Sequence, residues 1–107
     1  MKTSPRRIIE VKGNPSRKVS QGRSKGKIKS RSQRDLQASI WIWDAIRQLV
    51  EHKCEKPDDE IALGLPATEF YCNYLSRITW FRRELSIFVY LVYETEVKVF
   101  EPTGNIR

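Results

Sequence analysis

The chain has 107 residues, enough for one domain and too few for two. Its net charge of +7 is unevenly distributed: residues 1–34 carry twelve basic residues and one acidic residue (net +11), whereas residues 35–107 carry eight basic and twelve acidic residues (net −4). The longest apolar run, at 87–93, has seven residues and is far shorter than a membrane span of about 20. This composition excludes a uniformly cationic domain and indicates a basic N-terminal arm, 1–34, followed by a small globular domain, 35–107.

Most of the arm is expected to be disordered in isolation. Between residues 13 and 32, charged residues, Gly and Ser dominate, and such a segment cannot bury enough apolar surface to offset the entropy of ordering. The exception is a possible short strand over residues 7–12. There Ile8, Ile9 and Val11 are β-branched, and Gly13 and Pro15 end the run.

A first amphipathic helix is predicted over residues 32–53. Ser32 and Asp35 are its candidate N-caps, and His52 and Lys53 suit its C-terminus. Residues with helical periodicity form one apolar face, namely Ala38, Ile42, Trp43, Ala45, Ile46, Leu49 and Val50. Trp41 falls outside this face, among polar residues.

A second amphipathic helix is predicted over residues 66–84, with Pro66 in its first turn. Its apolar stripe consists of Phe70, Tyr74, Ile78, Phe81 and Leu85. Between the two helices, a short helical turn over residues 57–62 is expected to end at Gly64. Residues 87–100 are rich in β-branched and aromatic types and alternate over 94–100, so one or two strands are predicted there, ended by Pro102.

These elements predict a small single α+β domain, with two amphipathic helices packed on a short two- or three-stranded sheet, preceded by the disordered basic arm. A domain of this size buries only about 60% of its unfolded surface, so a bound polyanion, a protein partner or self-association is expected to stabilise it. Cys54 and Cys72 are the only cysteines. Two free thiols and an intracellular, reducing compartment, cytoplasm or nucleus, are expected for such a composition.

The basic arm gives the main functional signal. Lys and Arg attract phosphates by charge, which gives salt-dependent and largely sequence-independent binding of nucleic acids. A pliable arm on a domain rich in aromatic residues favours RNA over DNA, because proteins often recognise RNA at irregular or single-stranded regions. The candidate phosphate contacts in the arm are Arg6, Arg7, Lys12, Arg17, Lys18, Arg23, Lys25, Lys27, Lys29, Arg31 and Arg34.

A second candidate site lies in the globular domain. Arg77, Trp80 and Arg83 are spaced three residues apart, so on one helix an indole plane would lie between two cations. Such a surface could stack a base and hold its phosphates. The alternative is that Trp80 and Trp41 pack against the sheet or each other, since large aromatic side chains are usually buried.

Catalysis has weaker support. The chain has one His, no Ser/His/Asp set is credible and no ligand spacing typical of zinc occurs, so no catalytic residue, cofactor or metal is assigned. Two Glu-x-Lys tripeptides, at 10–12 and 96–98, lie in strand-like segments. With Asp58, the second resembles the pattern of Mg²⁺-dependent PD-(D/E)xK nucleases, although the same alternation is ordinary for an exposed strand.

The sequence therefore predicts a non-enzymatic nucleic-acid-binding protein, RNA being favoured, such as a ribonucleoprotein component or a viral accessory protein. The arm would contact phosphates, and the domain would position it or recruit a partner. The alternative is a protein-interaction module whose arm is only a nuclear or nucleolar targeting signal. The globular domain, with an edge strand near 94–100, would then form a homodimer or bind another protein. The Mg²⁺-dependent nuclease is a third, less supported hypothesis.

Overall fold

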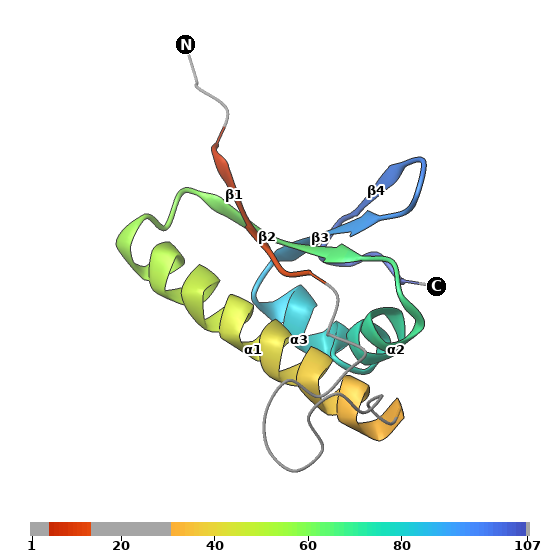
Figure 1. Ribbon diagram of the computed structural model, residues 1–107. Helices are drawn as coiled ribbons and strands as arrows, with labels where there is room; N and C mark the ends of the chain where they lie inside the picture. Colours follow the sequence, from red (N-terminus) through yellow and green to blue (C-terminus); the bar gives the residue numbers. More distant parts are fainter. Residues whose placement is uncertain (1–4, 14–30, 107) are drawn as a thin grey trace.

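The computed structural model describes residues 5–13 and 31–106, and of residues 31–35 it describes the backbone alone. The elements follow in the order β1 (Arg7–Val11), α1 (Arg31–Glu55), β2 (Glu60–Pro66), α2 (Glu69–Arg77), α3 (Thr79–Glu84), β3 (Ile87–Val92) and β4 (Val97–Phe100). The strands form one sheet in the order β1-β2-β3-β4 (Figure 1). The first three strands are parallel, and β4 is antiparallel to β3. The prediction of a small α+β domain is confirmed.

All three helices lie on one face of this sheet (Figure 1). Parallel neighbours need a crossover connection, and a helix is the usual one. Because crossovers are right-handed and each new strand is added on the same side of the last, α1 and the pair α2–α3 cover the same face. The other face of the sheet is not covered by any described helix.

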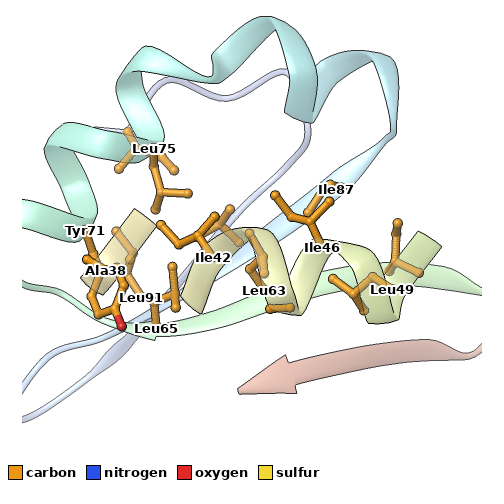
Figure 2. Close-up of a cluster of buried hydrophobic side chains, with 14 residues drawn as sticks. Ala38, Ile42, Ile46, Leu49, Leu63, Leu65, Tyr71, Leu75, Ile87 and Leu91 are labelled. Carbon is orange, nitrogen blue, oxygen red and sulfur yellow. The ribbon is translucent and has the colours of Figure 1, made fainter. Parts of the chain in front are cut away.

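The hydrophobic core lies between the sheet and the helices (Figure 2). Its most buried members come from α1, α2, β2 and β3, and they include Ala38, Ile42, Ala45, Ile46, Leu49, Ile61, Leu63, Leu65, Tyr71, Leu75, Ile87, Val89 and Leu91. The predicted apolar face of α1 is confirmed except for Trp43, which is 38% exposed. Its ring meets Phe81 edge-to-face, with centroids 4.9 Å apart.

The first helix is longer than predicted at both ends. It begins at Arg31 and ends at Glu55. Ser32 and Asp35 therefore lie inside the helix, and neither is its N-cap.

The short helical turn predicted over residues 57–62 is wrong, because residues 60–66 form β2. This strand is central in the sheet and its five middle residues are buried on both faces, so it shows no polar alternation. The short run of Ala and Leu is then ambiguous between helix and strand. Gly64 fits here because a Cβ atom would lie 3.1 Å from a methyl group of Val11 and 3.2 Å from one of Ile9.

The predicted single helix over 66–84 is two helices that meet at Ile78. The backbone there has φ −109° and ψ 27°, outside the helical region, and the Ile78 amide bonds only three residues back, to Leu75. The break changes which side chains face the core. Tyr71, Leu75 and Arg82 are fully buried, whereas Phe70, Tyr74, Ile78 and Phe81 of the predicted stripe are half-buried.

The sheet is also larger than predicted, with four described strands in place of two or three. β1 supplies one edge of the sheet and pairs with β2 from Arg7↔Glu60 to Val11↔Gly64. Within the described part of the chain, no helix combines the length and apolar character needed to cross a membrane.

The turn between α3 and β3 offers a first prediction. Ser86 has φ 55° and its amide bonds to the carbonyl of Arg83, so a non-glycine residue holds the left-handed position that closes a helix. Because glycine avoids the Cβ clash there, we expect Ser86→Gly to raise the free energy of unfolding by about 0.5–1 kcal/mol. Ser86→Val should lower it, as measured by urea denaturation.

A matched control for this turn is Ser76→Gly. Ser76 is exposed and lies within α2, where glycine weakens a helix by about 0.5 kcal/mol relative to serine. The two Ser→Gly substitutions should therefore change stability in opposite directions. A loss of stability for both would contradict the role given to Ser86.

Candidate nucleic-acid interface

The most basic part of the chain is a connection between two elements of the fold. Six of the predicted phosphate contacts lie outside the described residues: Arg17, Lys18, Arg23, Lys25, Lys27 and Lys29. The segment that contains them, residues 14–30, follows Gly13 at the end of β1 and precedes Arg31 at the start of α1. The folded domain therefore fixes both of its ends.

Gly13 is held by contacts on both sides. The hydroxyl of Tyr71, a buried residue of α2, donates a 2.8 Å hydrogen bond to the Gly13 carbonyl. Next to it, Lys12 Nζ lies 2.8 Å from Asp44 Oδ2 on α1. Hydrogen bonds from Lys12 and then Arg47 lower the pKa of the Asp44 carboxyl to about 2. These contacts fix the position of Lys12 and Gly13, the last described residues before the basic segment.

An open groove of about 450 Å³ lies at the same point. Its lining residues are Val11, Lys12, Gly13, Ile40, Trp41 and Asp44. Trp41, the misfit of the helical wheel, is half-buried against the end of β1 here. The indole and the aliphatic side chains give the groove an apolar wall beside one ion pair.

The other end of the basic segment enters α1 at Arg31. Arg31 and Arg34 are in the first turn of this helix, which contains no acidic residue. Helix N-termini carry a partial positive charge that acidic side chains usually offset. In α1, Arg31 and Arg34 instead add their charges to the partial positive charge of the helix N-terminus.

The cations of the described N-terminal segment, by contrast, are paired with carboxylates. Arg7 donates to Glu60 Oε1 at 3.0 and 3.2 Å and to the Tyr90 hydroxyl at 2.9 Å. Arg6 lies 3.1 Å from Asp59 Oδ2, and Lys12 is paired with Asp44 as described. The predicted contacts Arg6, Arg7 and Lys12 are therefore already matched by acidic groups of the domain.

Asp59 is the centre of this pairing at the start of β2. Its Oδ2 lies 2.7 Å from Nε2 of His52 as well as near Arg6, and its backbone carbonyl accepts a hydrogen bond from Lys53. The hydrogen bond from Arg6, followed by that from His52, lowers the pKa of Asp59. The single histidine thus joins the end of α1 to the start of β2.

The predicted surface of Arg77, Trp80 and Arg83 is divided by the break at Ile78. Arg77 ends α2, and its guanidinium lies 4.9 Å from the ring centroid of Tyr74. Trp80 and Arg83 lie on α3, three residues apart, and both are exposed. Trp80 is 64% exposed, so the alternative in which it packs against the sheet or Trp41 is wrong for this residue.

The aromatic contact that sequence reasoning missed is on the outer side of α1 and α2. The Nε1 of Trp43 donates to the hydroxyl of Tyr74, and Arg77 stacks on the same Tyr74 ring. The helical wheel placed Trp43 in the core, and the only sequence signal for its partial exposure is its place at the margin of that face.

The residues of the nuclease hypothesis do not converge on one site. Asp58 precedes β2 at the amino end of the parallel strands, whereas Glu96 precedes β4 at the opposite end, where Val97 pairs with Val92. In β1, Glu10 Oε1 lies 3.9 Å from Lys12 Nζ, but Asp44 is the closer partner of that ammonium group. Within the described ranges, no group of three or more His, Cys, Asp or Glu side chains could hold a metal ion.

The two cysteines are free thiols. Cys54 is exposed near the end of α1, and burial raises the pKa of Cys72 on α2. Neither thiol lies beside the groove at Gly13.

Comparison with protein-family models, with curated proteins and with solved structures found no match to this chain.

Proposed function

We propose that this protein is a non-enzymatic nucleic-acid-binding protein, with RNA favoured over DNA, and that the basic segment between β1 and α1 contacts the phosphates. The observation that carries the proposal is the charge of that segment. Residues 14–30 contain six basic and no acidic residues, and the fold fixes both ends of the segment.

The ion pairs of the domain refine the set of phosphate contacts. Arg6, Arg7 and Lys12 already neutralise Asp59, Glu60 and Asp44, so they contribute little to polyanion affinity. The contacts that remain are Arg17, Lys18, Arg23, Lys25, Lys27, Lys29, Arg31 and Arg34. The unopposed N-terminus of α1 adds to the positive potential at the end of this set.

Trp80 supplies the second part of the proposed interface. It is largely exposed on α3, and Arg83 is exposed on the same short helix. Stacking of a base on an aromatic side chain contributes about 1–3 kcal/mol, and it does not depend on which base stacks. This sequence tolerance agrees with the largely sequence-independent binding expected from the cationic segment.

The test is a titration of a fluorescently labelled single-stranded RNA with the full chain, followed by anisotropy between about 50 and 200 mM salt. A variant with Arg17, Lys18, Arg23, Lys25, Lys27 and Lys29 changed to Gln removes six cations. Each phosphate contact contributes about 0.7 to the slope of log affinity against log salt. We therefore expect a slope smaller by about 4 and an affinity at least ~100-fold weaker at the lower salt concentration.

The matched control is the double variant Arg6→Gln/Lys12→Gln, which removes two cations that are already paired. Its salt slope should change by less than about 1. Equal slopes for the wild-type chain and the six-residue variant would disprove the proposal. The same titration with single-stranded DNA of the same sequence tests the preference for RNA.

A further inference from the structure

The open face of the sheet is strongly apolar. Side chains of β2 and β3 alternate, and Ile61, Leu63, Leu65, Ile87, Val89 and Leu91 point to the helices. The residues between them on β2 and β3 therefore point away from the helices. The residues of β1 and β4 that pair with these outward residues also point away from the helices. On this face Ile9, Val11, Val92, Val97 and Val99 are 40–68% exposed. The sheet is drawn with its helices on the opposite side in Figure 1.

Parallel strands are usually covered on both faces, and three of the four strands of this mixed sheet are parallel. Here both crossovers lie on the same side, and no described element covers the other. Exposed apolar surface of this extent on a soluble domain usually marks an interaction site.

The charge of this face argues for a second copy of the same chain. Its charged side chains, Arg7 and Glu60, pair with each other at 3.0 Å. The Arg7 guanidinium also lies 3.8 Å from the ring centroid of Phe88 and donates to the Tyr90 hydroxyl, so all these contacts of Arg7 are made within the face. Among the described residues of this face, the cation is already paired and would add little to the binding of a polyanion, whereas a second copy would meet it with apolar side chains and an equally paired charge.

The size of the face is sufficient for a dimer. Strands about 4.8 Å apart and residues about 3.3 Å apart make four strands of five residues cover roughly 300 Å² as a flat area. The relief of half-exposed side chains increases the accessible area to several hundred Å² per copy. Two copies would bury roughly 600 Å² as flat area and up to about 1,000 Å² with this relief, which only reaches the lower limit for a specific interface and predicts a weak dimer.

From these observations we infer that two copies of this chain associate sheet against sheet through the open face, as an isologous dimer. This packing would cover the open side of the three parallel strands, with the two sheets about 10 Å apart and their inner side chains interdigitated. The inference is independent of the proposed nucleic-acid binding. If both hold, each particle carries two cationic segments, and binding to one long RNA gains from their linkage.

The test is sedimentation equilibrium of the full chain across micromolar concentrations at high salt, with and without prior nuclease treatment. We expect a concentration-dependent rise from one to two monomer masses. Val99→Lys, at the middle of β4, would bury an ammonium group and should weaken dimerisation at least ~10-fold. The double variant Val97→Thr/Val99→Thr keeps β-branched side chains and should weaken dimerisation by a smaller factor. It tests the same surface if the lysine variant fails to fold.

The matched control is Leu36→Lys, which changes an apolar residue that is 62% exposed on α1. This variant should dimerise as the wild type does. Three results would overturn the inference: a wild-type chain that stays monomeric, association that disappears with nuclease, or a dimer that Leu36→Lys disrupts and Val99→Lys does not. The first would leave the face to a different protein, and the second would indicate bridging by RNA.

Discussion

Replacing Arg82 with alanine is expected to lower the free energy of unfolding by about 3 kcal/mol or more. Arg82 is fully buried on α3, and it donates to the carbonyls of Glu101 and Gly104 at 3.1 and 3.3 Å. These bonds hold the turn after β4 against the helix, where Ile106 joins the core. Truncation leaves a cavity and removes the guanidinium donors from both carbonyls, of which that of Glu101 keeps the Gly104 amide as a donor. Urea denaturation followed by circular dichroism measures the loss.

The variant Arg82→Met separates the volume of this side chain from its charge. Burial lowers the pKa of Arg82, and its Nε has no hydrogen-bond partner, so the folded domain bears a desolvation cost for the cation. Methionine fills much of the space without that cost and should lose less than about 1.5 kcal/mol. A loss equal to that of Arg82→Ala would contradict this account and would assign the whole effect to the two hydrogen bonds.

The second large effect is expected at Tyr71. This fully buried residue packs in the core and anchors Gly13, so Tyr71→Ala should lower the free energy of unfolding by about 3–5 kcal/mol. Tyr71→Phe removes only the hydroxyl and should lower it by about 1 kcal/mol. In the proposed RNA titration, Tyr71→Phe tests whether fixing the start of the basic segment affects affinity, because it leaves every cation in place.

Alkaline pH gives an independent readout of the same residue. Burial raises the pKa of Tyr71 to about 12, from the usual value of 10. The folded chain therefore holds the phenolic proton when the unfolded chain has lost it. This contribution to stability is complete below pH 10 and is lost as the pH rises to about 12. Tyr71→Phe should lose less stability than the wild type over this interval, and parallel curves would contradict the role of burial.

The parts of the fold that were predictable are those with a long and regular pattern. The apolar face of α1 repeats over residues 38–50, so the helix and all its predicted core side chains except Trp43 could be read from the sequence. β2 could not be, because it is short, apolar on both faces and composed largely of residues that also suit helices. The alternation of Val97 and Val99 was correctly assigned to a strand, although these residues face the open side of the sheet.

Contacts between distant residues limited the prediction of the site. Arg6 and Arg7 pair with Asp59 and Glu60, 53 positions away, and only the parallel register of β1 on β2 brings them together. Among the three arginines near α3, the sequence does not mark Arg82 as the buried one. Its burial depends on carbonyl groups 19 and 22 positions away. The basic composition of residues 14–30, by contrast, could be read from the sequence because it does not depend on how the strands pair.

The position of β1 has a consequence for the order of folding. Arg7 and Glu60 are 53 positions apart, so β1 cannot pair until the whole of α1 and the start of β2 have been synthesised. The β3–β4 hairpin, by contrast, closes over a few residues. β1 therefore leaves the ribosome first and is added to the sheet late. Until then the basic segment is attached to the folding domain only through α1, and the docking of β1 is the step that fixes its second end.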